Sequence, residues 1–290
     1  MSHILLTGIV TLDIINYLDS YPKEDSEVRA TSQQIRRGGN ASNTATVLSQ
    51  LGHDCLLAAT LSNDSSAQWL RKDLTDKHIK LQPSNELAGH TTPTSYITLN
   101  TENGSRSIIH YRDLPELTFH QFDEINLEKT NWFHFEGRNI NETLKMMKKS
   151  RSYNKRVSLE LEKDRDDIET LIPLADIICF SRSFAKSNNY TRADDCLNHY
   201  SSIYPNKLLI CTWGAKGAFA KHNNLEYFSP AFHSTQAIDT IGAGDTFNAG
   251  FIHAQLKNLS TQDSLTYACK LSGLKCSQSG FTNLEEFDVK

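Results

Sequence analysis

Short apolar runs alternate along this chain with segments whose apolar residues recur at helical spacing. The runs have the length and composition of buried strands, and they occupy residues 4–10, 55–61, 132–135, 157–161, 177–180 and 208–212. Helical patterns cover residues 66–77, 141–150, 193–200, 243–256 and 260–277, and a further helix ends at residue 51 before Gly52. Strands that alternate with helices predict an α/β fold with a mostly parallel sheet covered on both faces.

Two polar segments, residues 13–35 and 92–112, interrupt this alternation. Residues 94–111 predict a β-hairpin, because alternating apolar residues flank the dipeptide Asn103-Gly104. We expect one domain over residues 1–290, with a small β-sheet lid formed by the two polar segments. Such a sheet exposes its edges and is marginally stable alone, so it predicts a twofold homodimer that packs lid against lid.

Composition narrows the function without defining it. Thirty basic and 34 acidic residues give a net charge of −4, which argues against a protein that binds nucleic acid through bulk charge. The mean hydropathy of −0.46 leaves no room for a membrane domain. The six cysteines form no Cys-x-x-Cys pair, and the first ten residues lack the pattern of a signal peptide. These features predict a reducing, cytoplasmic location.

The most informative motif is a glycine-rich loop before the predicted helix at residues 243–256. Gly242, Ala243 and Gly244 allow a turn whose backbone N–H groups point one way, and the helix N-terminus adds partial positive charge. This predicts a phosphate-sized anion site. Asp245 could accept a hydroxyl proton there; we expect the helix terminus to keep it ionised and therefore weakly basic, which phosphoryl transfer tolerates. The alternative is a tight turn followed by a helix-terminal aspartate.

A second glycine pair, Gly38-Gly39, precedes two asparagines. Asn40 and Asn43 are three residues apart, so they share one face of a helix start, and their amides suit the mixed hydroxyls of a sugar. Alternatively, Asn40 is only an N-cap. Asp13 follows the first strand at its expected carboxyl end, where open α/β sheets bind ligands; capping of a turn is the other interpretation.

These motifs resemble those of the PfkB (ribokinase-like) family of sugar kinases. The resemblance runs from about residue 5 to 281 and is carried by Gly-Gly-Asn-Ala-Ser-Asn at 38–43 and Asp-Thr-Ile-Gly-Ala-Gly-Asp-Thr-Phe at 239–247. Tyr-Pro-Lys-Glu-Asp-Ser-Glu at 21–27 and Glu-Gly-Arg-Asn at 136–139 are similar to a branch that phosphorylates the 1-hydroxyl of fructose. The resemblance implies a three-layer ribokinase-like sandwich, ATP and Mg²⁺ as cofactors, Asp245 as base and residues 242–244 as anion hole.

The same resemblance assigns residues to the two substrates. It implies that Asp13, Gly39, Asn40 and Asn43 hold the ketose, and that Asp25 reaches the partner copy's sugar site. For ATP it implies Arg106, Arg138, Gly214, Ala215, Lys216, Gly217, Gly242, Gly244 and Cys276. On chemistry alone, a lid cation at Arg106 could neutralise phosphate after closure. Arg106, Arg138 and Lys216 could equally be solvated, and Cys276 could be a packing thiol.

The metal ligands are not apparent from the sequence. Many relatives carry an Asn-x-x-Glu motif that organises Mg²⁺ through water, whereas this chain has Ser-Arg-Ser-Phe at 181–184. Glu160 and Glu162 lie near a strand end and are either functional or surface residues. K⁺ activation, which the resemblance also suggests, would use backbone oxygens near Asp239 and leave no side-chain signal.

The residues therefore predict an ATP-dependent kinase that acts on fructose or a related ketose. Another kinase of the same family, such as a ribokinase, a different fructokinase or a nucleoside kinase, is the nearest alternative. A sugar or nucleotide sensor that lost catalysis is a second, which retention of Asp245 disfavours. A Rossmann dehydrogenase is not supported, because no Gly-x-Gly-x-x-Gly follows the first strand.

Overall fold

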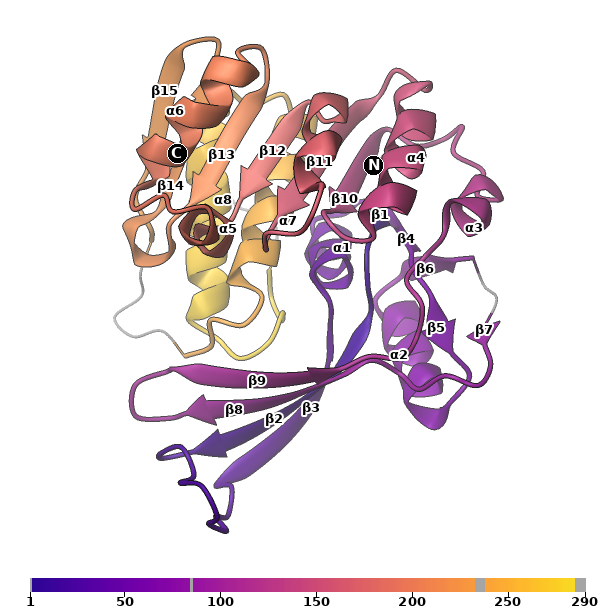
Figure 1. Ribbon diagram of the computed structural model, residues 1–290, viewed down its shortest axis with the longest axis vertical. Coiled ribbons are helices and arrows are strands. Elements are labelled where there is room, and N and C mark those ends of the chain that lie inside the picture. Colours follow the sequence, from indigo (N-terminus) through magenta and orange to yellow (C-terminus); the bar gives the residue numbers. More distant parts are fainter. Residues whose placement is uncertain (1, 84–85, 233–237, 285–290) are drawn as a thin grey trace.

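The computed structural model describes residues 2–83, 86–232 and 238–284, and its centre is a nine-stranded sheet (Figure 1). The strand order is β15-β14-β13-β12-β11-β10-β1-β4-β6. From β6 to β13 neighbouring strands are parallel, and β14 and β15 add an antiparallel edge. The strands are His3–Thr7 (β1), Asp54–Ala58 (β4), Ile79–Gln82 (β6), Trp132–Glu136 (β10), Arg156–Leu161 (β11), Ile177–Phe180 (β12), Leu208–Thr212 (β13), Ala218–His222 (β14) and Leu225–Ser229 (β15).

Helices cover both faces of this sheet, because its inner strands are apolar on both sides. In β1, Ile4 and Leu6 enter one core cluster and Leu5 enters the other. The first cluster is closed by Asn40–Gln50 (α1), Ser65–Asp76 (α2), Ala243–Leu256 (α7) and Thr261–Cys276 (α8). The second is closed by Phe119–Asp123 (α3), Ile140–Arg151 (α4), Arg182–Ser187 (α5) and Ala193–Ile203 (α6). The three layers confirm the predicted α/β class.

A separate four-stranded sheet, which we call the lid sheet, lies beside the main body (Figure 1). Its order is β3-β2-β8-β9, formed by Ser32–Gly38, Thr11–Leu18, Thr94–Asn100 and Arg106–Tyr111. The last two make the predicted hairpin. The prediction that residues 13–35 contribute to a small β-sheet lid is confirmed for β2 and β3, and Ile15 of β2 is fully buried in one core cluster with Ile97 and Leu99. Only residues 19–31 are irregular, apart from a turn at residues 24–25.

Several shorter elements escaped the sequence prediction. Residues 55–61 divide between β4 and a two-residue strand, Leu61–Ser62 (β5), which pairs with Glu86–Leu87 (β7). Two 3₁₀ segments, Ile168–Leu174 (η1) and Gly214–Lys216 (η2), connect strands. All six cysteines are free thiols. Within the described residues, no helix has the length and apolar character needed to cross a bilayer.

Candidate active site

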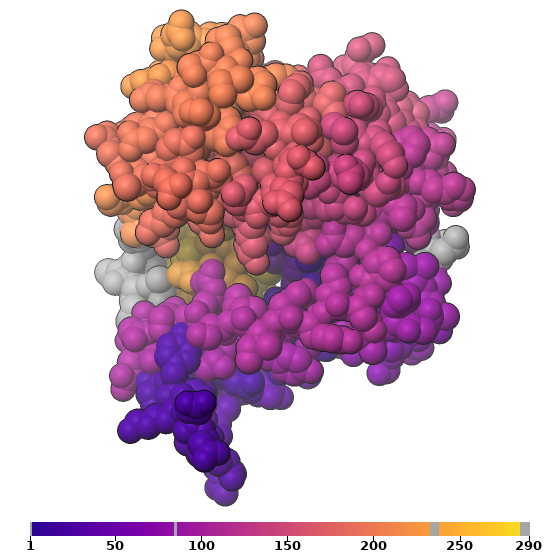
Figure 2. Space-filling model, viewed as in Figure 1, coloured from indigo at the N-terminus to yellow at the C-terminus, as the bar shows by residue number. Residues whose placement is uncertain are grey.

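A cavity of about 670 Å³ separates the lid sheet from the carboxyl ends of the parallel strands, and Figure 2 shows the molecule hollowed between these two parts. Most of the predicted site residues line it: Asp13, Gly39, Asn40, Asn43, Arg106, Arg138, Gly214, Gly242, Ala243, Gly244 and Asp245. Residues more than 200 positions apart in sequence therefore converge on one site. The carboxyl edge of a parallel sheet is where α/β folds bind their ligands.

The anion loop has the geometry that its glycines predict. Gly242 adopts φ = 78° in the left-handed region and caps α7, and a side chain at this position would strike the ring of Phe281. Gly244 is different, because a methyl group there would meet nothing within 4 Å. The space in front of Gly244 is therefore open to a ligand, beside the N–H groups that a helix start leaves without intrahelical partners.

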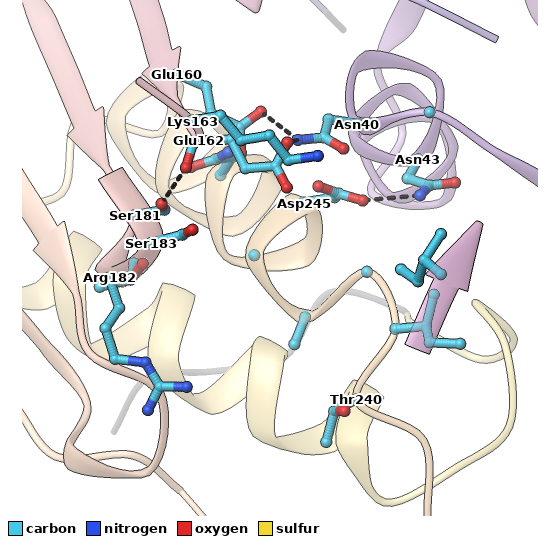
Figure 3. A pocket seen from close by; sticks show the side chains of 18 of the residues that line it. Asn40, Asn43, Glu160, Glu162, Lys163, Ser181, Arg182, Ser183, Thr240 and Asp245 are labelled. Atoms are coloured by element: carbon cyan, nitrogen blue, oxygen red, sulfur yellow. Dashed lines mark hydrogen bonds between the residues drawn. The ribbon is translucent and has the colours of Figure 1, made fainter. Parts of the chain in front are cut away.

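Asp245 lies in the first turn of α7 and is buried at the floor of the cavity. The amide of Asn43 donates to its Oδ2 at 2.7 Å (Figure 3). Burial raises the pKa of Asp245 to about 7, and Glu162, Glu136 and Asp13 add to the rise. The expectation of a fully ionised, weakly basic carboxylate is therefore wrong: desolvation outweighs the helix terminus. A carboxylate with this pKa is matched to proton transfer near neutral pH.

Helix α1 presents both asparagines to the cavity. Gly39, at φ = 98°, occupies the N-cap position, so Asn40 does not cap the helix. The Asn40 amide instead lies 3.3 Å from Oε2 of Glu160 and 3.3 Å from Oε2 of Glu162. Asn43 uses its nitrogen on Asp245 and leaves Oδ1 without a hydrogen-bond partner among the described residues. A buried acceptor of this kind is available to a substrate hydroxyl.

Asp13 lines the cavity from the lid sheet. It follows β1 in the chain, as expected, and it lies in β2, within the segment predicted to form the lid. Its Oδ1 accepts a hydrogen bond from the hydroxyl of Thr11 at 3.0 Å, and burial raises its pKa. Its carboxylate occupies the space that a side chain at Gly38 would need. The first glycine of the pair is thus required by the close approach of Asp13.

Two buried glutamates at strand ends had no role assigned from the sequence: Glu160 lines the cavity, and Glu136 does not line it but contacts the start of α1. Glu136, at the end of β10, accepts hydrogen bonds from the N–H groups of Ala41 (2.5 Å) and Ile9 (3.3 Å). It therefore places a negative charge at the start of α1, where the helix dipole favours one. Glu160, at the end of β11, is buried rather than on the surface, and burial raises its pKa well above the ordinary value.

Cations gather at the mouth of the same cavity. Arg106, on β9, donates to the hydroxyl of Thr240 at 2.9 Å. Arg138 is already engaged, with its Nη2 2.8 Å from Glu116, so Arg106 is the better phosphate candidate of the two. Four further cations that the sequence did not identify line the cavity close to the ends of β11 and β12: Lys163, Arg182, Arg165 and Lys186 (Figure 3 labels the first two).

The loop at 213–217 contributes less to the cavity than expected. Gly214 lines it, but Ala215, Lys216 and Gly217 do not. Lys216 is exposed. Gly217 adopts φ = 93°, and the carbonyl of Ser229 lies where a side chain would be, so both features require glycine there. Cys276 and Asp25 are also outside the cavity lining. The carbonyl of Cys276 accepts from the N–H of Ile238 at 2.8 Å, which gives it a structural contact.

Few residues of the cavity could bind Mg²⁺. Phe184, which stands where the motif of many relatives has its glutamate, is fully buried in the core. No cluster of three potential metal-ligating side chains occurs in the described part of the chain. Mg²⁺ in phosphoryl-transfer sites often uses only one or two carboxylates together with substrate phosphates. Glu162 and Glu160, both lining the cavity, fit that smaller requirement.

The region in which the resemblance places K⁺ already contains a protein cation. The fully buried ammonium of Lys275 donates to the main-chain oxygen of Asp239 at 2.8 Å and lies 3.2 Å from its Oδ2. Arg36 contacts the same Oδ2 at 2.6 Å. Two oxygens that a monovalent cation could use thus face an ammonium group. K⁺ activation stays a prediction.

The fold and this site define a phosphotransferase: a buried carboxylate lies beside a glycine-rich helix start in a cleft with a basic mouth. The family model for pfkB family carbohydrate kinases matches residues 1–287. The chain therefore belongs to this family. It is 36% identical to the ketohexokinase of Mus musculus, over 97% of this chain and 98% of that protein.

More distant relatives include enzymes that are named ribokinases. The ribokinase of Dictyostelium discoideum is 24% identical over 96% of both chains. The crystal structure of a putative ribokinase from Agrobacterium tumefaciens superposes with a TM-score of 0.85 at 19% identity, covering 98% of this chain and 94% of that one. These similarities confirm the ribokinase-like fold and the predicted family of enzyme, a kinase that acts on a carbohydrate.

Proposed function

We propose that this protein is an ATP-dependent ketohexokinase, which transfers the γ-phosphoryl group of ATP to the 1-hydroxyl of fructose. The observation that carries the proposal is the contact between two helices: Asn43 of α1 holds Asp245 at the start of α7, next to the open space at Gly244. A sugar hydroxyl and a phosphate can therefore meet in front of one carboxylate. The 36% identity to a ketohexokinase supports fructose as the acceptor.

In the proposed reaction Asp245 removes the proton from the attacking hydroxyl. As the O–H bond breaks, the oxygen forms its bond to the γ-phosphorus of ATP and the bond to the bridging oxygen breaks, which leaves ADP. Residues 242–244 stabilise the charge on the transferring oxygens through their N–H groups and the helix dipole. Because the transition state is loose, position matters more than base strength, and Asn43 fixes the carboxylate at 2.7 Å.

The sugar would occupy the acidic floor of the cavity. Asp13, Asn40 and the unpaired Oδ1 of Asn43 offer acceptors and donors for its hydroxyls, and Gly39 keeps the backbone close. Carboxylates that accept hydrogen bonds from neighbouring sugar hydroxyls discriminate strongly against sugars that lack one of those hydroxyls. Binding of such a sugar would leave a buried acceptor unpaired. These residues are our proposed fructose contacts.

The nucleotide would lie toward the basic mouth. Arg106 and Arg182 line that part of the cavity, and Gly214 provides a wall without a side chain. Mg²⁺, when bound with ATP, would neutralise the β- and γ-phosphates, and Glu162 and Glu160 are the residues that would hold its ligands or waters.

The outer face of the lid sheet supports the proposed homodimer. Ile109 is 73% exposed, and Tyr96 and Tyr111, on the same face, are 49% and 56% exposed. Tyr96 pairs directly with Ile109 across the hairpin, so the apolar side chains form one patch. In such a dimer the loop carrying Asp25, whose φ is 60°, would approach the partner's sugar site. Free cysteines suit a reducing, cytoplasmic location.

The test is product analysis. Purified protein is incubated with MgATP and fructose, and the position of the new phosphate ester is determined by ³¹P and ¹H NMR. We expect fructose 1-phosphate. A panel containing ribose and adenosine tests the alternative that the 24% identity to a ribokinase suggests. Phosphorylation of ribose or a nucleoside with no turnover of fructose would reject our choice of substrate.

A further inference from the structure

The segment that leads into the anion loop is held by the lid sheet through three contacts. Arg36 of β3 donates from Nη1 to Oδ2 of Asp239 at 2.6 Å, and Arg106 of β9 donates to Thr240 at 2.9 Å. Ile241 packs against the apolar core of the lid sheet. The strands β3 and β9 are opposite edges of that sheet, so residues 239–241 lie across its inner face. Gly242, the first residue of the anion loop, follows directly.

Asp239 is the point at which the lid and the main body meet. Its carboxylate is buried, and besides Arg36 it accepts from the N–H of Gly280 at 3.0 Å and from that of Ile241 at 2.9 Å. Lys275 of α8 binds it from the main body. The other end of the Arg36 guanidinium donates to the hydroxyl of Ser279 at 2.7 Å. One lid side chain therefore bridges the start of the anion loop and the C-terminal turn.

The side chain of Arg36 lies on the same face of the lid sheet as the residues that line the cavity. It pairs across the sheet with Asp13, whose carboxylate lines the cavity. Side chains directly opposite one another in an antiparallel pair share a face. A movement of β2 and β3 toward bound sugar would therefore carry Arg36 along with Asp13, and Arg36 would transmit that movement to Asp239.

We propose that Arg36 is a positioning residue, which couples closure of the lid sheet to the geometry of the anion loop. It touches neither the reacting atoms nor the base. It holds residues 239–241 against the lid, so that the N–H groups at 242–244 reach their working position only when the lid is docked. This inference rests on the proposed kinase function and adds an expectation to it: hydrolysis of ATP by water should be slow without bound sugar, because an undocked lid leaves the anion loop unformed.

We expect the protein to fold without Arg36. Asp239 keeps Lys275 and two backbone N–H donors, so no buried charge loses all its partners. The side chain of Arg36 is only partly buried. A kinetic defect in Arg36→Met without a large fall in Tm would therefore report on coupling rather than on the core.

The experiment compares Arg36→Met, Arg36→Lys and Ser279→Ala with Arg29→Met, which removes an exposed arginine from the same lid segment. Each is measured for kcat and KM with fructose and ATP, for ATP hydrolysed per fructose phosphorylated, and for Tm. A charge-assisted hydrogen bond predicts a fall in kcat of about 10- to 100-fold for Arg36→Met, more ATP lost to water, and a Tm within about 3 °C of wild type. Arg36→Lys should recover part of kcat, Ser279→Ala should show a smaller loss in the same direction, and Arg29→Met should match wild type.

Two results would overturn the inference. One is a wild-type kcat and hydrolysis ratio in Arg36→Met. The other is a loss of activity that follows the fall in Tm, with KM and the hydrolysis ratio unchanged, which indicates a structural role. If Arg36→Met does not fold, unchanged kinetics in both Arg36→Lys and Ser279→Ala overturn it. Wild-type protein that phosphorylates no sugar would reject the proposed function instead.

Discussion

Replacement of Asp245 by asparagine tests the proposed base at the centre of the site. The change keeps the shape of the side chain and removes the charge that Asn43 contacts at 2.7 Å. A positioned general base contributes about 10²- to 10⁴-fold, so we expect kcat to fall by about 10³-fold, or about 4 kcal/mol of transition-state stabilisation. Initial rates of ADP release with saturating fructose and MgATP measure the effect.

The pH dependence of the wild-type enzyme gives an independent readout of the same group. Because the pKa of Asp245 is raised to about 7, kcat/KM should rise as the pH increases through about 7 and then level off. The stability of the folded protein should change with pH in the opposite direction to kcat/KM. Folded protein binds the proton more tightly than unfolded protein, whose aspartate has an ordinary pKa, so Asp245 destabilises the fold progressively as the pH rises from about 4 to about 7.

The Asp245→Asn variant should therefore have a higher Tm than wild type at pH 8 and a smaller difference at pH 5. Asp195→Asn is a matched control, since Asp195 is an exposed first-turn aspartate of α6, and it should leave both kcat and Tm unchanged. A kcat for Asp245→Asn within tenfold of wild type, in protein that still binds ATP, would refute the assignment of the base.

Three further outcomes follow from the geometry of the cavity. Gly244→Ala adds a methyl group to open space in front of the anion loop. Its Tm should therefore stay within about 2 °C of wild type, while kcat falls at least tenfold. An unchanged kcat would show that no phosphate approaches this position. Arg106→Met should raise the KM for ATP about tenfold and leave the KM for fructose nearly constant, as steady-state kinetics with each substrate varied can show. Asp25→Ala should raise the KM for fructose without changing that for ATP, and only in protein that sediments as a dimer; an unchanged fructose KM would separate Asp25 from the sugar site.

The anion loop could be predicted from the sequence because its chemistry is local. Gly242, Gly244 and Asp245 lie within four consecutive residues, and each is explained by the turn and helix that those residues form. The six inner strands of the main sheet were equally accessible, since burial on both faces leaves continuous apolar runs. The outer strands β6, β14 and β15 were not predicted, because residues such as Gln82, His222 and Leu225 are not buried.

The remaining parts of the site depend on contacts between distant segments. Glu136 acts at the start of α1, 95 residues away from Ala41 in sequence, and no local pattern distinguishes it from a surface glutamate. The error on Asp245 has the same origin: its pKa is controlled by burial among carboxylates from other strands, which outweighs the helix to which it belongs. The run predicted as one strand over residues 4–10 ends at Thr7, where the chain leaves the main sheet, and the chain enters the lid at Thr11.

The distribution of charge in the cavity favours one orientation of the two substrates. Asp13 and Asp245 are buried at its floor, so a phosphate placed there would meet two carboxylates in a medium of low dielectric constant. Neutral hydroxyls meet no such repulsion and can hydrogen-bond to them. Arg106 and Arg182 instead line the part of the cavity that a triphosphate can enter. We therefore expect the two ligands to occupy different ends of the cavity, with the γ-phosphoryl group approaching the sugar beside residues 242–244.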